Sequence, residues 1–268
     1  MMSTVPSIFV SHGAPTLVFD PVPTRDFLRS LARTIPRPKA ILCVSAHWDT
    51  TAPRVGSTLR PHTMHDFYGF PEKLYDLHYP ASGYPALAEQ AANLLDAADI
   101  PVTLDDQRGL DHGAWVPLSL MYPLADIPVL QLSIQSHLPP DHHLQMGRAL
   151  APLREEGVLI IASGNATHNL RDVFNHDMLE PPVPYAKAFA DWLTARIVSG
   201  GAGDSDALLD YLRQGPNGHR NHPSPDHFLP LLVALGAGTG NGTNNCAGRL
   251  LHDGYTYGVL SMAAYAWG

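Results

Sequence analysis

Short apolar runs alternate with longer amphipathic stretches along this chain. Near-continuous aliphatic runs of four to eight residues are typical of β-strands that are buried on both faces. Each such run therefore predicts a strand inside a covered sheet. The four clearest are Ser7–Val10, Ala40–Val44, Pro128–Ile134 and Val158–Ala162.

Helical patterns occupy much of the chain between and after these runs. Apolar side chains recur there three or four residues apart, which places them on one face of a helix. Thr24 suits the N-cap of the first of these helices, because its hydroxyl can accept a hydrogen bond from a free backbone N–H. We expect helices over Thr24–Arg33, Tyr84–Ala97, His142–Leu153, Tyr185–Val198, Asp204–Leu212 and Pro225–Leu235.

This order of strands and helices predicts an α/β fold, a three-layer sandwich with a mostly parallel central sheet. The segment Pro53–Pro80 departs from the pattern, because it is rich in Pro, Gly, His and aromatic residues. We expect a long ordered loop there. No stretch has the composition of a linker between domains, so residues 1–268 are expected to form a single catalytic domain.

Composition narrows the class of protein. With 45% hydrophobic and 16% charged residues, the chain can bury a sizeable core. Its net charge of -8 and its scattered Lys and Arg argue against a nucleic-acid partner, because phosphate binding needs clustered positive charge. No apolar run is long enough to cross a membrane, and the N-terminus lacks the pattern of a signal peptide. With only two cysteines, Cys43 and Cys246, the sequence is not that of a disulfide scaffold, so a cytoplasmic location is expected.

Histidine is the outlier in this composition, with 15 residues. His12 and His47 each stand within two residues of a serine at the end of an apolar run, and Asn165 and His168 follow a third run. Ligands bind at the carboxyl ends of the strands in open α/β sheets, and the strand ends carry these side chains to one edge. One such histidine would more often cap its strand, but three at one edge favour a site. Because histidine is the commonest metal ligand, we expect a metal-dependent enzyme.

Two more histidines have weaker signals. His112 lies in an expected loop, where Asp111 beside it could orient its ring. Pro225 suits the first turn of a helix, which would place His227 just inside that turn. The zinc-hydrolase helix motif, the phosphate-binding glycine-rich loop and the Gly-x-Ser-x-Gly nucleophile motif are absent from the sequence.

Six blocks of sequence in a fixed order carry a resemblance to a known family. Any one of them would be weak alone, whereas together they cover nearly the whole chain. They are Ser11–Pro15, Ser45–Trp48, His65–Pro71 with Tyr75 and Tyr79–Ala81, Asp111–Trp115, Ser163–Asn165 with His168–Leu170, and Pro225–His227. In this order the chain resembles the class III extradiol ring-cleavage dioxygenases, and among them the 4,5-DOPA dioxygenase branch of the LigB superfamily.

The resemblance implies a non-haem Fe(II) enzyme that uses O2 to cleave the ring of a DOPA-like catechol. Position by position, His12, His47 and His227 match the metal ligands of the family. His168 matches its acid–base histidine, which can also come within reach of the metal, and His112 matches a second histidine of the pocket.

The resemblance also extends to the substrate. The Pro-rich segment at His222 matches the one that borders the substrate, and Asn165 is expected to contact the substrate as well. The aromatic side chains of one loop could wall a flat ring or simply pack that loop: Phe67, Tyr68, Phe70 and Tyr75. The expected partners are a small aromatic diol and O2, and the protein is expected to be a monomer or a small homo-oligomer.

The third ligand position departs from the general pattern of the superfamily. Many class III enzymes use two histidines and a carboxylate, whereas this chain has His227 there, with Asp226 beside it. Three imidazoles also suit zinc, so Zn(II) can occupy the site at rest while Fe(II) serves catalysis. Two other readings stay open: a zinc-dependent hydrolase that uses the same histidines, which lacks a clearly placed general base, and a binding protein without catalysis.

Overall fold

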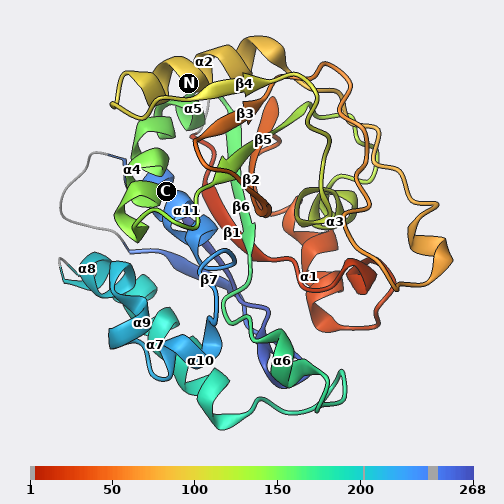
Figure 1. Ribbon diagram of the computed structural model, residues 1–268, viewed down its shortest axis with the longest axis vertical. Helices are drawn as coiled ribbons and strands as arrows, with labels where there is room; N and C mark the ends of the chain where they lie inside the picture. The colour runs from red at the N-terminus through yellow and green to blue at the C-terminus, as the bar shows by residue number, and fades with distance from the viewer. Residues whose placement is uncertain (1–3, 202, 241–246) are drawn as a thin grey trace.

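A mixed, eight-stranded sheet forms the centre of the computed structural model, which describes residues 4–201, 203–240 and 247–268 (Figure 1). Its strands are β1 (Ser7–Ser11), β2 (Ala40–Asp49), β3 (Arg54–Gly56), β4 (Thr103–Asp105), β5 (Val129–Ile134), β6 (Val158–Gly164), β7 (Arg249–His252) and β10 (Ala264–Trp267). Their order is β4-β3-β5-β2-β6-β1-β10-β7, and the central strands β5, β2, β6 and β1 run parallel. A small separate sheet pairs β8 (Tyr255–Thr256) with β9 (Leu260–Ser261).

Helices cover both faces of the large sheet, which makes three layers. On the right in Figure 1 lie α1 (Pro23–Leu31) and α3 (His112–Met121). On the other face lie α2 (Pro85–Asp96), α4 (Pro140–Leu150), α5 (Pro152–Glu155), α7 (Pro184–Ser199), α8 (Asp204–Leu209), α9 (Tyr211–Gln214) and α11 (Leu229–Thr239). The remaining short helices are η1 (Pro15–Val18), η2 (Glu72–Leu74), α6 (Leu170–Val173) and α10 (Gly218–Asn221).

The apolar runs build two cores, one on each face of the sheet. Along β2, Leu42 and Val44 join the core beneath α4 and α11, whereas Ile41 and Cys43 join the core beneath α1 and α3. Successive side chains of a strand point to opposite faces, so a strand that is covered twice must be apolar throughout. The predicted α/β sandwich with a mostly parallel sheet is confirmed. Cys43 is a buried free thiol, and Cys246 lies outside the described residues.

The predicted N-cap of the first helix, Thr24, is wrong. The helix α1 begins at Pro23 with Val22 at the N-cap position, and no side chain caps it. Proline suits a first helical position because its missing N–H has no partner to lose there. The hydroxyl of Thr24 instead contacts Nε2 of His252 at 3.0 Å.

The last predicted helix begins later than expected. The main-chain N–H groups of Phe228 and Leu229 both donate to the carbonyl of Pro225, which forms a turn, and α11 starts only at Leu229. His227 therefore lies in the turn before the helix and not inside its first turn. Two other predicted helices are split in two: the segment from His142 breaks before α5, which begins with a proline, and the segment from Asp204 breaks between α8 and α9.

The long loop predicted over Pro53–Pro80 is largely present, with the short strand β3 at its start and the helix η2 within it. It passes outside α3 on the right of Figure 1, and Thr63 forms an isolated bridge with Leu110 just before that helix. None of the helices in the described part of the chain has both the length and the apolar character needed to cross a bilayer.

Candidate metal centre

Two histidines stand at the carboxyl end of the parallel strands. His12 directly follows β1, and its N–H donates to the carbonyl of Gly164 at 3.0 Å. His47 lies within β2, which runs on to Asp49, beyond the predicted apolar run. Nε2 of His12 and Nε2 of His47 are 2.9 Å apart. The strand-end placement predicted for both residues therefore brings their rings into direct contact.

His227 joins this pair from the turn before α11. One ligand atom from each of His12, His47 and His227 lies within 4.8 Å of the others, so the three side chains could hold a metal ion. The close approach depends on Gly164, because a Cβ atom there would lie 2.1 Å from the carbonyl oxygen of His227. The same carbonyl accepts a hydrogen bond from the N–H of Asn165 at 3.0 Å. Only a glycine lets the turn dock on the end of β6.

Hydrogen bonds indicate which ring nitrogens are free. Nδ1 of His12 is 2.9 Å from the hydroxyl of Ser163, which itself donates to the carbonyl of Gly113. The hydroxyl must therefore accept from Nδ1–H, which leaves the lone pair of His12 on Nε2. Nδ1 of His227 likewise contacts the carboxylate of Asp226, which leaves its Nε2 free. Orienting a ligand histidine through its second nitrogen in this way is common in metal sites.

These tautomers test whether the site suits a cation. Nε2 of His12 bears a lone pair and faces Nε2 of His47. Without a proton on His47, two lone pairs would oppose each other in a buried place, and a cation is the group that satisfies both. The donor set of neutral imidazole nitrogens suits Zn(II) and Fe(II) alike. The residues present therefore fit a divalent transition metal.

Burial keeps these rings neutral. It lowers the pKa of His12 and of His227 well below the ordinary value, and the neighbouring imidazoles lower both further. Burial also lowers the pKa of His47 to about 4, an effect that His112 reinforces and that nearby Asp111 opposes. Neutral imidazole is the form that binds metals, so the site is in its ligand form at neutral pH.

His112 lies on one flank of this cluster. It is the first residue of α3, and its ring centroid is 3.9 Å from that of His47. Asp66 accepts hydrogen bonds from both the main-chain N–H of His112, at 2.9 Å, and Nδ1, at 3.0 Å. Although burial alone would raise it, these bonds lower the pKa of Asp66 to about 2. The hydrogen-bond partner of the His112 ring is therefore Asp66, and not the adjacent Asp111.

His168 lies on the opposite flank. Its ring stacks on that of His227 with centroids 3.4 Å apart and an angle of 10° between the planes. Its main-chain N–H donates to the carbonyl of Asn221 at 2.8 Å. Burial lowers the pKa of His168 to about 4, against an opposing effect of Asp226. His168 is therefore a neutral imidazole at neutral pH.

The two residues expected to contact substrate have other contacts. The amide oxygen of Asn165 accepts from the N–H of Gly13 at 3.1 Å. The ring of His222 is buried and packs edge-on against Phe228, and its Nε2 is 3.0 Å from the carbonyl of Ala166. Both side chains help to hold the segments that carry the cluster. Their role toward substrate stays a prediction.

The structure adds side chains that the sequence did not single out. Asp66 and Ser163 orient histidines, yet Asp66 stands in a loop, and nothing in the sequence pairs Ser163, at the end of β6, with His12. Membership of the segment His65–Pro71 was the only signal for Asp66. In the same segment Phe67 packs edge-on against His112, with ring centroids 5.8 Å apart, whereas Tyr68 is 92% exposed. Phe67 thus walls the cluster, and Tyr68 does not.

Known proteins resemble this chain over most of its length. The family model of the catalytic LigB subunit of aromatic ring-opening dioxygenase matches residues 1–266. A protein of Beta vulgaris named 4,5-DOPA dioxygenase extradiol is 44% identical, over 97% of this chain and 95% of its own. A protein of the same name from Escherichia coli (strain K12) is 47% identical, over 90% of this chain and 88% of its own. The crystal structure of an uncharacterized Escherichia coli K12 protein, 40% identical, matches with a TM-score of 0.81 over 98% of this chain and 100% of that one.

Proposed function

The chain belongs to the LigB family of aromatic ring-opening dioxygenases, and from this premise we propose that it is a non-haem Fe(II) enzyme that opens the ring of a DOPA-like catechol. As an extradiol dioxygenase it acts on an aromatic substrate and O2. The metal and the substrate are the parts that we propose. The proposed substrate follows from relatives that are named 4,5-DOPA dioxygenase extradiol.

The observation that carries the proposal is the convergence of His12, His47 and His227, whose ligand atoms lie within 4.8 Å of one another. These three residues would hold the metal ion. Bound there, Fe(II) would supply the redox chemistry with O2 and a positive charge that favours loss of a catechol proton. Three protein ligands leave further coordination positions for the reactants. Zn(II) fits the same donors and can occupy the site at rest.

The histidines on the two flanks would handle protons. His168 is neutral at neutral pH, the form that would take the proton of a catechol hydroxyl made more acidic by the metal and return it to an oxygen atom later. His112 donates Nδ1–H to Asp66, so its Nε2 side can hydrogen-bond the oxygen atoms of the reactants. Phe67 offers an apolar face edge-on to His112, against which a flat ring can pack.

His222 and Asn165 complete the proposed site at the border of the substrate. Their buried contacts with Ala166 and Gly13 support a role in shaping that border rather than in proton transfer. We further propose that residues 1–268 act as a single catalytic domain, in the cytoplasm, as a monomer or a small homo-oligomer. Size-exclusion chromatography with light scattering measures the last of these directly.

The test is metal reconstitution without air. Protein stripped by a chelator is loaded with Fe(II) under anaerobic conditions, DOPA is added, and O2 uptake is followed with the absorbance of the ring-opened product. We expect O2 consumption that equals product formed, and none with the Zn(II)-loaded protein. A panel of catechols without any O2 uptake would contradict the proposal. Hydrolysis of an ester or amide by the Zn(II) form, independent of O2, would instead support the hydrolase.

A further inference from the structure

A buried carboxylate beneath the histidines has no part in the chemistry described so far. Asp111 is fully buried, yet it accepts hydrogen bonds from the hydroxyl of Ser45 at 2.6 Å, from Nη2 of Arg108 at 2.6 Å and from Nε2 of Gln131 at 2.8 Å. A buried charge is costly unless it is paired and hydrogen-bonded, and here it is both. Its partners come from β2, from β5 and from the chain before α3.

One side of this network holds His47 by its main chain. The N–H of His47 donates to the hydroxyl of Ser45 at 3.2 Å, and that hydroxyl donates to Asp111. The carbonyl of His47 accepts from Nη2 of Arg108 at 3.3 Å, and the same Nη2 donates to Asp111. Both main-chain polar groups of His47 are thus tied to one carboxylate through a single intermediate each.

The other side of the network holds His112. Asp111 is the N-cap of α3, where its Oδ1 accepts from the N–H of Ala114 at 3.2 Å, and His112 is the first residue of that helix. The next residue brings the two sides together: a Cβ atom at Gly113 would lie 2.4 Å from the hydroxyl of Ser45 and 3.1 Å from Cδ2 of His47. The helix start and β2 therefore meet with no room for a side chain.

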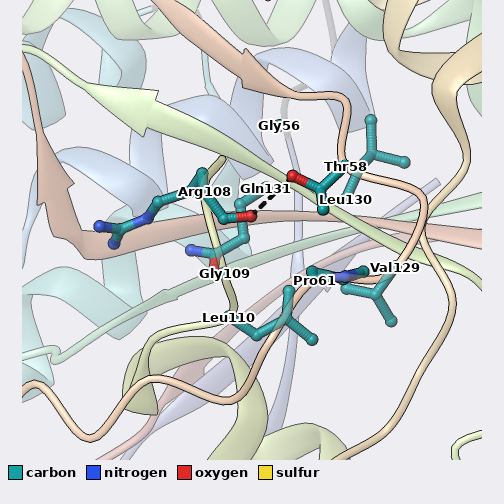
Figure 2. Close-up of a pocket in the computed structure, with 9 residues that line it drawn as sticks. All are labelled: Gly56, Thr58, Pro61, Arg108, Gly109, Leu110, Val129, Leu130 and Gln131. Carbon is teal, nitrogen blue, oxygen red and sulfur yellow. Dashed lines mark hydrogen bonds between the residues drawn. The ribbon is translucent and has the colours of Figure 1, made fainter. Parts of the chain in front are cut away.

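The base of the network is packed as well. Figure 2 shows Arg108 and Gln131 beside a cavity of about 10 Å³, with the hydroxyl of Thr58 donating to the carbonyl of Arg108 at 3.2 Å. Such a volume holds at most about one water molecule. Gln131 also accepts from the N–H of Asp111 at 3.0 Å, which fixes the cap to β5. The carboxylate has little freedom to move.

We propose that Asp111 is a positioning residue that sets the separation and orientation of His47 and His112. Asp111 joins β2, which carries the proposed metal ligand His47, to α3, which begins with His112, a histidine proposed to handle protons. Misplacing a reacting group by about 1 Å can cost about 10²-fold in rate, so such an anchor acts on catalysis without touching a reactant.

A second buried carboxylate offers a matched control. Asp204, at the start of α8, accepts hydrogen bonds from a serine hydroxyl (Ser199), from an arginine (Arg196, 2.9 Å) and from a main-chain N–H (Gly201, 2.7 Å). It resembles Asp111 in its partners. In the described part of the chain, however, it contacts none of the five histidines of the cluster, which are His12, His47, His112, His168 and His227. A change at Asp204 therefore reports what loss of a buried carboxylate does to stability alone.

The experiment compares Asp111→Asn and Ser45→Ala with Asp204→Asn. Three quantities are measured: the Zn(II) dissociation constant by chelator competition, the imidazole ¹⁵N signals of His47 and His112 in metal-free protein, and kcat per metal-loaded site. We expect Asp111→Asn and Ser45→Ala to weaken Zn(II) binding about 10- to 100-fold, to shift both sets of signals and to lower kcat. Asp204→Asn should lower Tm and change none of the three.

The outcomes separate this proposal from the proposed function. The kcat measurement rests on ring cleavage, whereas Zn(II) affinity and the imidazole signals do not depend on the substrate. If Ser45→Ala leaves both of these unchanged and lowers only Tm, as Asp204→Asn does, the positioning role of Asp111 is refuted. Should Asp111→Asn fail to fold, Ser45→Ala decides, because it removes one hydroxyl and keeps the carboxylate paired with Arg108.

Discussion

The five clustered histidines are held in two different ways. His12 and His47 stand at the strand ends, where hydrogen bonds hold their main chains: the N–H of His12 donates to the carbonyl of Gly164 in β6, and the N–H and carbonyl of His47 bond to Ser45 and Arg108. His112, His168 and His227 stand at a helix start, after a strand, and in a turn, where side-chain contacts hold their rings. We infer that the strand ends fix the position of the first pair, whereas the other three, the loop-borne trio, depend on contacts between distant segments.

The sharpest way to break this comparison is to remove a strand-borne ring. His47→Ala is expected to abolish stoichiometric metal binding, because it deletes one of three converging nitrogens. Metal content after dialysis against Zn(II) or Fe(II), measured by elemental analysis, checks this. The control is His252→Ala, which removes a histidine on β7 outside the cluster. Stoichiometric metal retained by His47→Ala would contradict the assignment.

The loop-borne side should respond differently to the loss of a ring. His168→Ala is expected to keep the metal and to lower kcat by about 10²–10⁴, the usual contribution of acid–base assistance. Steady-state O2 uptake on protein of known metal content measures the effect. Ring cleavage at a near-normal rate would assign the proton transfer to His112 instead.

A smaller effect on metal affinity distinguishes a ligand histidine that is held in a turn from one that is held at a strand end. Asp226→Asn weakens the contact that orients His227, and we expect metal affinity to fall about 10- to 100-fold. Ser163→Ala removes the equivalent contact of His12, but the strand ladder still fixes that residue, so a smaller loss is expected. Chelator competition on both variants gives the comparison. Equal losses would mean that the strand adds nothing to the position of the ring.

Acid sensitivity of the metal-free protein is an expected effect that the two halves should share. The folded pKa values of His47 and His168, about 4, lie below the ordinary value of about 6.5, so between these values the unfolded chain binds more protons. Stability of the metal-free protein should therefore fall as pH falls from about 6.5 toward 4. Asp66 adds a loss at lower pH, as it is protonated near 2.

Urea denaturation across this range, with and without Zn(II), measures the effect. His47→Gln and His168→Gln should each flatten the decline by a similar amount. His143, which is buried outside the cluster and has a pKa lowered by burial to about 3, controls for the metal: His143→Gln should flatten the decline as well, but it should leave the effect of Zn(II) unchanged. A pH-independent stability in the wild-type protein would contradict the expectation.

The strand-borne half could be predicted from the sequence, because the apolar runs mark the strands and the histidines stand where these runs end. Apolar runs that end in a small residue and a histidine identify both the strand and the edge to which it leads, and His12 and His47 lie there. The parallel sheet follows from the same runs. This part of the molecule depends on local pattern, which a single sequence contains.

The loop-borne half depends on contacts between distant segments. Asp66 reaches His112 from a loop without any periodicity, and no spacing in the sequence joins them. The sequence predicts His227 inside a helix, because Pro225 suits a first turn. In the structure the N–H groups of Phe228 and Leu229 both donate to the carbonyl of Pro225, and the helix begins only after this turn. Asp111 lies beside His112 in the sequence but bonds Ser45, Arg108 and Gln131 instead of its ring, because neighbours in sequence need not face each other. Among these residues, His112 and His227 could be assigned to one site from the sequence only through the resemblance to a family.

The three converging nitrogens also join distant parts of the chain. His12 follows the first strand, whereas His227 precedes the last long helix, so a shared metal ion would act as a reversible cross-link between the two ends of the fold. Cross-links over long loops restrict the unfolded chain most. Chelation should then do more than stop turnover: it should shorten the lifetime of the folded protein against proteases, with the first cleavages in the segment that carries the turn before α11.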